Sequence, residues 1–110
     1  MQADPVLTNL RKGVLEHCVL AVLRDDEVYG VDLAHRLVEA GLLASEGSLY
    51  PLLARLRSAD MVSTRWQESP SGPPRRYYRL TPAGLSAVDR FIDIWRPFSR
   101  AVDTIFERTS

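Results

Sequence analysis

The chain opens with a helical pattern of apolar residues. Over TNLRKGVLEHCVLAVLR (8–24), apolar side chains recur every three or four positions, at 10, 14, 15, 18, 19, 22 and 23. This is the period of an amphipathic helix. Thr8 or Asn9 can cap its start, and the acidic run RDDE at 24–27 marks its end.

A second helix is predicted over VYGVDLAHRLVEA (28–40), closed by Gly41 as a C-terminal glycine.

A third helix is predicted within SEGSLYPLLARLRSAD (45–60). Proline is tolerated only in the first helical turn, where its missing N–H has no partner to lose. We therefore place the cap at Ser48, a tight turn at 45–47, Pro51 at the third helical position and the end near Ala59. The buried stripe consists of Leu49, Leu52, Leu53 and Leu56, whereas Tyr50, Ala54, Arg55 and Arg57 lie away from its centre.

The next pattern alternates with a period of two and predicts a β-hairpin. In MVSTRWQE (61–68), Val62, Thr64 and Trp66 alternate with Ser63, Arg65 and Gln67. SPSGPP (69–74) is turn chemistry, and RRYYRLT (75–81) is a second strand. Trp66 is expected either to pack under the hairpin or to cover the first helix.

TPAG (81–84) then starts a long last helix, with Thr81 as the cap and Pro82 at its first position. It is predicted to run to about Arg108. Near-heptad apolar positions are Leu85, Val88, Ile92, Trp95, Val102 and Phe106, and a neighbouring stripe holds Phe91, Ile94, Phe98 and Ile105. This apolar surface is wider than one small domain can cover, which predicts a partner helix from a second copy. Pro97 is expected to kink or divide the helix near Trp95–Arg96.

These elements predict a mainly α fold with a small β-hairpin. Three helices and a hairpin form a winged helix-turn-helix DNA-binding domain over residues 1–81, and residues 82–110 form a long C-terminal dimerisation helix. In such folds the third helix enters the major groove of DNA.

Charge supports a nucleic-acid partner only through its distribution. The net charge is zero, but residues 44–80 hold six arginines against three acidic residues. On charge alone, a basic face and a chance scatter of arginines both remain open. Ser45, Ser48 and Tyr50 can donate to phosphates or bases, and Arg55 and Arg57 suit backbone phosphates. Arg75 and Arg76 lie beside the flexible hairpin tip, where they suit an adjacent phosphate or the minor groove.

Other classes of function find little support. The single cysteine, Cys18, excludes an internal disulfide and is expected to be an inert core residue, and His17 and His35 lack metal-ligand spacing. No nucleophile–base pair or phosphate-binding loop indicates an enzyme or a cofactor. No signal peptide or membrane span is recognised, so we expect a cytoplasmic protein without a membrane partner.

The chain resembles the PadR-type transcriptional regulators of the short form, with a single C-terminal helix. The residues that carry the resemblance are LRKGVLEHCVLAVL (10–23), YGVDL (29–33), GSLYPLLARLRSADMV (47–62) and RRYYRLTPAG (75–84). The resemblance implies a homodimeric repressor that reads an inverted repeat with its third helix and wing. It also implies dimerisation through the terminal helix, often packed against the first.

Some members of that family bind planar aromatic compounds between the subunits. The resemblance makes Phe91, Trp95 and Phe98 candidates for lining such a site for a small aromatic effector, although packing in the dimer core is the favoured interpretation. The other alternative is a winged-helix protein-interaction module without DNA affinity.

Overall fold

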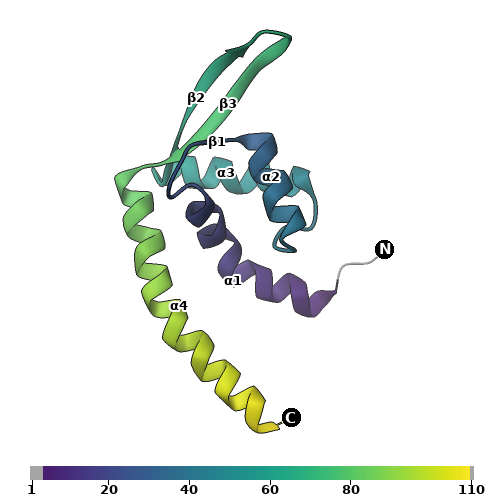
Figure 1. The fold of residues 1–110 in the computed structure, drawn as a ribbon, viewed down its shortest axis with the longest axis vertical. Coiled ribbons are helices and arrows are strands. Elements are labelled where there is room, and N and C mark those ends of the chain that lie inside the picture. The colour runs from purple at the N-terminus through teal and green to yellow at the C-terminus, as the bar shows by residue number, and fades with distance from the viewer. Residues whose placement is uncertain (1–3, 110) are drawn as a thin grey trace.

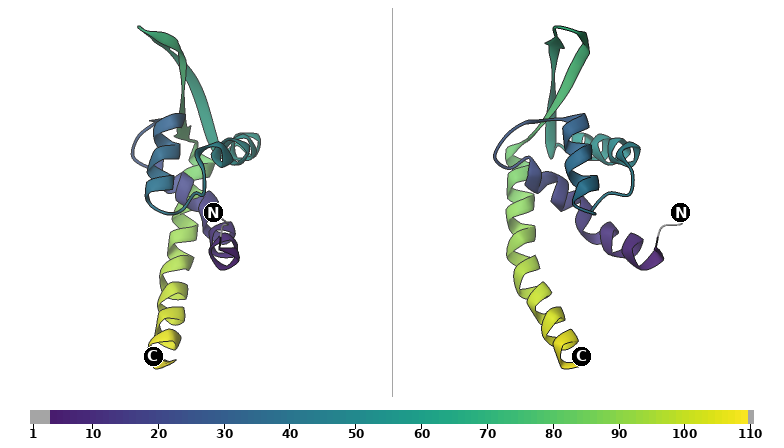
Figure 2. Two further views of the ribbon diagram at one scale, coloured as in Figure 1. Left: turned by 90° about the vertical axis from the view of Figure 1, so that its right-hand side faces the viewer. Right: turned by 45° about the vertical axis from the view of Figure 1, so that its right-hand side comes forward.

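The computed structural model describes residues 4–109. In chain order the elements are α1 (Pro5–Val22), β1 (Val28–Tyr29), α2 (Gly30–Glu39), the short 3-10 helix η1 (Glu46–Ser48), α3 (Leu49–Ser58), β2 (Val62–Ser69), β3 (Gly72–Leu80) and α4 (Pro82–Thr109). The molecule is elongated, at 56 × 37 × 21 Å. Figures 1 and 2 show the β2–β3 hairpin, hereafter the wing, and α4 projecting in opposite directions from a central group of helices.

The predicted mainly α fold with a small hairpin is confirmed, and the sheet gains a third strand. Val28 and Tyr29, assigned above to the second helix, pair with Tyr78 and Tyr77 of β3, which gives the antiparallel order β1-β3-β2. Both residues favour extended backbone, and the partner strand lies almost fifty residues away. α2 therefore begins only at Gly30.

The first helix begins earlier than predicted. Asp4 is its N-cap and accepts a hydrogen bond from the Val6 N–H at 2.9 Å, while Pro5 occupies the first turn. Thr8 lies inside the helix, and its hydroxyl donates to the Asp4 carbonyl. The placement of the cap at Thr8 or Asn9 was wrong because an aspartate directly before a proline is the stronger start signal.

The helix-turn-helix follows the predicted layout with one correction. Gly41 ends the second helix with a φ of 78°, in the left-handed region that favours glycine. The third helix begins after Ser48, so Pro51 does fall at its third position. Ser48 is not a side-chain cap, because its backbone is already helical and its hydroxyl donates to the Ser45 carbonyl at 2.7 Å. The 3-10 turn η1 leads the chain into the helix instead.

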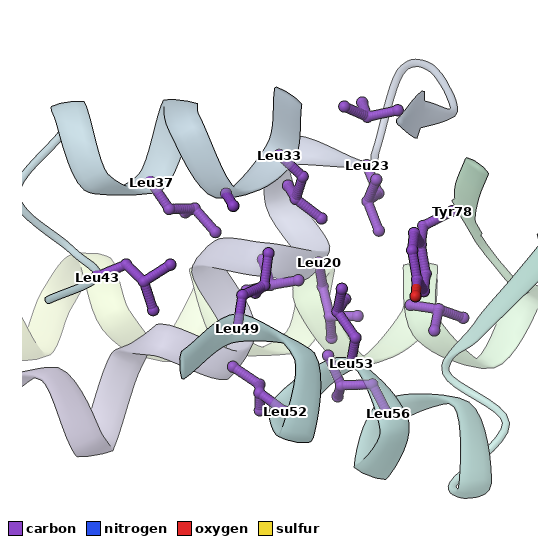
Figure 3. Packing of buried hydrophobic residues seen from close by; sticks show 14 of the residues in the cluster. Leu20, Leu23, Leu33, Leu37, Leu43, Leu49, Leu52, Leu53, Leu56 and Tyr78 are labelled. Atoms are coloured by element: carbon purple, nitrogen blue, oxygen red, sulfur yellow. The ribbon is translucent and has the colours of Figure 1, made fainter. Parts of the chain in front are cut away.

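The core is built mainly from leucines of the three N-terminal helices. Figure 3 shows Leu20 of α1, Leu33 and Leu37 of α2, and Leu49 and Leu53 of α3 converging on one another. The four predicted leucines of α3 are all buried. The wing adds Val62 and Tyr78, and α4 adds Val88. This packing fixes α3 by one side and leaves its other side to solvent.

The last helix starts as predicted and is not divided. The Gly84 N–H donates to the Thr81 hydroxyl oxygen at 3.0 Å, which caps the helix. α4 continues through Pro97 to Thr109, and its lower part curves gradually in Figure 1. Pro97 has no N–H to donate to the Asp93 carbonyl, yet the flanking turns remain helical.

Candidate nucleic-acid interface

α3 presents a polar face because its leucines occupy the opposite side. Leu49, Leu52, Leu53 and Leu56 are at most 6% exposed. The five side chains predicted for DNA contact in this region are all exposed, and they are Ser45, Ser48, Tyr50, Arg55 and Arg57. Among residues 4–109, no ion pair is formed by Arg55 or Arg57. Both side chains are therefore exposed and free of ion pairs in this part of the chain, which leaves their charge available to an anion such as a phosphate.

The turn before α3 holds an acidic residue that sequence reasoning missed. Glu46 pairs with His35 of α2, with Nε2 and Oε1 2.7 Å apart. This pair joins η1 to α2 and so positions the start of the third helix. Ser48 already donates its hydroxyl proton within the turn, so it must exchange that bond to reach a phosphate. A carboxylate in this position also weakens anion binding there.

Tyr50 lies where the third helix meets the wing. A Cβ atom added at Gly30 would lie 3.2 Å from the Tyr78 ring and 3.8 Å from the Tyr50 ring, so both rings pack beside this glycine. Partial burial raises the pKa of Tyr50, and nearby Tyr78, Tyr29 and Glu46 raise it further. The hydroxyl therefore keeps its proton and can donate to a phosphate oxygen.

The wing is longer and its turn tighter than predicted. Residues 69–74 were assigned to a loop, but β2 extends to Ser69 and β3 starts at Gly72. Prolines 73 and 74 lie near the tip, beyond the short β1, where one edge of β3 has no neighbouring strand. A strand edge without a hydrogen-bonding neighbour tolerates proline. Arg75 and Arg76 are strand residues, as predicted.

Arg75 and Arg76 occupy opposite faces of the wing. Arg76 pairs with Trp66 and Arg75 with Gln67. We call the face that carries the buried Val62 and Tyr78 the inner face. It also carries Trp66 and Arg76, whereas Arg75 belongs to the outer face. The two arginines therefore cannot make equivalent contacts with one strand of DNA.

Each of these arginines lies over an aromatic ring. On the outer face, the Arg75 guanidinium lies 5.0 Å from the ring centroid of Tyr29. On the inner face, the Arg76 guanidinium lies 5.4 Å from the Trp66 ring, and Nη2 donates to the Thr64 hydroxyl at 3.3 Å. Such contacts hold a guanidinium in place without neutralising it.

Arg65, in contrast, is engaged in a structural ion pair. Its Nε donates to both carboxylate oxygens of Glu27, at 3.0 and 2.9 Å. The guanidinium also lies over the Tyr77 ring. The hydrogen bond from Arg65 lowers the pKa of Glu27. This pair fastens the segment before β1 to the wing.

Trp66 is exposed, contrary to both expectations stated for it. Its exposed fraction is 65%. The alternating pattern correctly placed it on the face of the core residues. The wing, however, extends beyond the helices in Figure 2, so this part of the face has nothing to cover it. Sequence reasoning missed Trp66 as a candidate functional residue for that reason.

Three aromatic residues of α4 form a row that starts at α1. The His17 ring stacks on Phe91, with centroids 3.9 Å apart and 6° between the planes. Phe91 is followed by Trp95 and then by Phe98, at centroid distances of 6.0 and 6.4 Å. Phe91 is half-buried under His17, whereas Trp95 and Phe98 are 41% and 59% exposed. The structure thus brings the three predicted residues together on one surface.

Residues 4–109 offer little basis for other kinds of site. No group of three metal-ligating side chains occurs in this part of the chain. Burial raises the pKa of Cys18, which opposes formation of a reactive thiolate. No helix among the described residues has the length and apolar character needed to cross a bilayer.

Comparisons with known proteins agree with this geometry. The family model described as "Transcriptional regulator PadR-like family" matches residues 19–90. The transcriptional regulator Rv3488 of Mycobacterium tuberculosis is 39% identical over 79 residues, which cover 72% of this chain and 68% of that protein.

Solved structures are similar as well. A PadR-like regulator of Bacillus cereus has 36% identity and a TM-score of 0.81, with 89% of this chain and 96% of that chain covered. A PadR-like transcription factor of Bacteroides fragilis has 41% identity and a TM-score of 0.74, covering 93% and 99%. The fold also resembles that of Bacillus subtilis PadR in complex with operator DNA, at 24% identity and a TM-score of 0.65, covering 72% and 46%.

Proposed function

Since the chain belongs to the PadR-like family of transcriptional regulators, we propose that it is a homodimeric repressor that binds an inverted-repeat operator in the cytoplasm. The observation that carries this proposal is the two-sided character of α3, with four buried leucines on one side and exposed Tyr50, Arg55 and Arg57 on the other. A helix anchored in this way can enter a major groove without exposing the core. The family is one of regulators and not of enzymes.

In this proposal, residues 1–81 bind DNA and residues 82–110 form the dimer. α4 exposes Ile94, Trp95, Phe98 and Ile105, each by at least 41%. Contiguous apolar surface of this kind on a soluble protein marks an interaction site. A second α4 is the simplest partner, because two copies bury the same surface on one another.

The dimer explains how repression and release operate. Two copies of α3 related by a twofold axis would occupy successive major grooves about 34 Å apart, and the bound dimer would block transcription. A planar aromatic effector between Trp95 and Phe98 of the two subunits would change the angle between the α4 helices. The long α4 would convert that small change into a larger displacement of the two α3 helices.

DNA binding is tested by footprinting and fluorescence anisotropy with the DNA upstream of the protein's own gene. The variant Arg75→Ala/Arg76→Ala is expected to bind at least tenfold more weakly. Arg96→Ala/Arg100→Ala removes the same charge from α4 and serves as the matched control. Wild-type protein without salt-dependent affinity for any DNA would favour the alternative, a protein-interaction module.

A further inference from the structure

We propose that Trp66 and Arg76 act together as a reader of the DNA minor groove on the inner face of the wing. This inference rests on the proposed DNA-binding function and assigns a role to a residue outside the predicted site. In it, the Arg76 guanidinium enters the groove, and the Trp66 indole packs against the adjacent sugars and excludes water.

The two side chains are held as a unit. Trp66 and Arg76 are cross-strand partners in the β2–β3 register. The Arg76 guanidinium lies near two rings, 5.4 Å from the Trp66 centroid and 5.7 Å from that of Tyr78. The hydrogen bond from Nη2 to the Thr64 hydroxyl restrains the guanidinium, and this bond would be exchanged when Arg76 enters the groove. An arginine that is already oriented loses less conformational entropy when it binds.

Trp66 is also exposed in a place that the proposed dimer does not cover. Within residues 4–109, the other exposed large hydrophobic side chains lie on α1 and α4, with the exception of Tyr50 on α3. Figure 1 shows the wing at the end of the molecule opposite to the tip of α4. Contact between two α4 helices would therefore leave Trp66 in solvent. Its indole is therefore accessible to a different partner, and Tyr50, whose ring lies beside that of Tyr78 on the same face of the wing, favours a partner on the DNA side.

Charge identifies the partner as nucleic acid. The wing carries Arg65, Arg75, Arg76 and Arg79 against the single acidic residue Glu68. Glu27 neutralises Arg65, whereas the other three arginines form no ion pair within residues 4–109 and keep their charge for an anionic surface. Arginine is favoured in narrow, A·T-rich minor grooves, where the negative potential is strongest. Apolar side chains next to such arginines are used by minor-groove proteins as wedges or as packing against the sugars.

The test uses the full-length protein and duplexes that wild type selects from a random-sequence pool. Trp66→Ala is expected to weaken binding about tenfold and to relax the preference for A·T pairs outside the α3 contacts. Gln67→Ala, on the outer face of the same strand, is the matched control and should stay within about twofold. The double variant Trp66→Ala/Arg76→Ala should weaken DNA binding by a smaller factor than the product of the factors for the two single variants, because the residues act together.

Fluorescence provides a second readout. The chain has two tryptophans, so the difference between wild type and Trp66→Phe isolates the indole on the wing. We expect the Trp66 emission to be quenched when a selected duplex is added. This measurement does not depend on whether Trp66→Ala folds, because it is made on wild type and on a conservative variant.

The outcomes separate the two proposals. If wild type selects no duplex above background, the repressor proposal and this inference both fail. If wild type binds selected DNA while Trp66→Ala keeps wild-type affinity and base preference, and the Trp66 emission does not change, only the inference is overturned. It is likewise overturned if Trp66→Ala alters self-association with unchanged DNA affinity per dimer, because Trp66 then contacts protein.

Discussion

The backbone carbonyl of Met61 occupies the space into which a Cβ atom on Gly84 would project. The same carbonyl accepts a hydrogen bond from the Thr81 N–H at 3.1 Å. The first turn of α4 is thereby packed directly against the start of β2. This joint sets the direction in which the proposed dimerisation helix leaves the DNA-binding domain.

Gly84→Ala is therefore expected to destabilise the protein by about 2 kcal/mol or more, since backbone must move to admit the methyl group. The added Cβ would also lie 2.9 Å from Leu80 Cδ2. Gly13→Ala is the matched control. An added Cβ at Gly13 meets nothing within 4 Å, and the substitution should stabilise α1 by about 0.5–1 kcal/mol. Urea denaturation at one fixed protein concentration measures both. Equal stability of Gly84→Ala and wild type would show that the joint can relax.

The Glu27–Arg65 pair predicts a specific dependence of stability on pH. Arg65 lowers the pKa of Glu27 in the folded state, so the pair stabilises the protein above the unfolded pKa of about 4.3. The contribution is lost as the pH falls through the lowered folded value. Urea midpoints of wild type and Glu27→Gln should therefore differ at pH 7 and converge on acidification. Glu68→Gln, which removes a carboxylate near the wing tip, should shift the midpoint less. A wild-type advantage that persists at low pH would contradict this account.

Arg57 is expected to contribute to DNA binding through charge and not through base recognition. Arg57→Gln should weaken binding to all duplexes similarly and make the slope of log K against log salt concentration shallower by about 0.9 per lost phosphate contact. A homodimer has two such contacts, which doubles the change. Arg100→Gln, on α4, should leave the slope as in wild type. A loss of affinity confined to one base position would instead make Arg57 a base-reading residue.

The apolar face of α4 predicts a monomeric variant. Ile94 is 56% exposed, so Ile94→Glu should not disturb the fold of one subunit. It would bury an unpaired charge between two α4 helices, which is strongly unfavourable. We expect sedimentation to show monomers and DNA affinity to fall at least tenfold. Arg100→Glu also introduces a negative charge, but on the polar side of the helix, and should remain dimeric. A dimeric Ile94→Glu protein would place the interface elsewhere.

The structural features that the sequence predicted correctly are set by neighbouring residues, whereas those that it missed depend on residues far apart in the chain. The leucine stripe of α3, the left-handed Gly41 and the Thr81 cap follow from spacing and from the chemistry of one or two residues, and the structure confirms them. β1 depends on pairing with a strand almost fifty residues away, which no local pattern of Val28 and Tyr29 reveals.

The wing shows that the same limit applies to predicting the candidate DNA-binding residues. Its alternating residues predicted the faces, but the exposure of Trp66 depends on how far the hairpin extends past the helices. The opposite faces of Arg75 and Arg76 follow from alternation along a strand that was predicted. The length of the wing, in contrast, depends on a turn that is shorter than its composition suggested. The pair formed by His35 and Glu46 joins two elements whose separation the sequence does not give.

Pro97 lies inside the continuous helix α4, which it weakens without breaking. Pro97→Ala restores an N–H for the Asp93 carbonyl and should stabilise the folded protein by about 1–3 kcal/mol. If the curve of α4 beyond Pro97 fits the two copies of Ile105 to their partners, the same variant should dimerise more weakly, because a straighter helix separates those ends. Ala101→Ser, one turn further on, serves as the control and should change neither quantity in this direction. Thermal unfolding and sedimentation equilibrium measure the two effects, and stronger dimerisation in Pro97→Ala would show that the curve does not serve the interface.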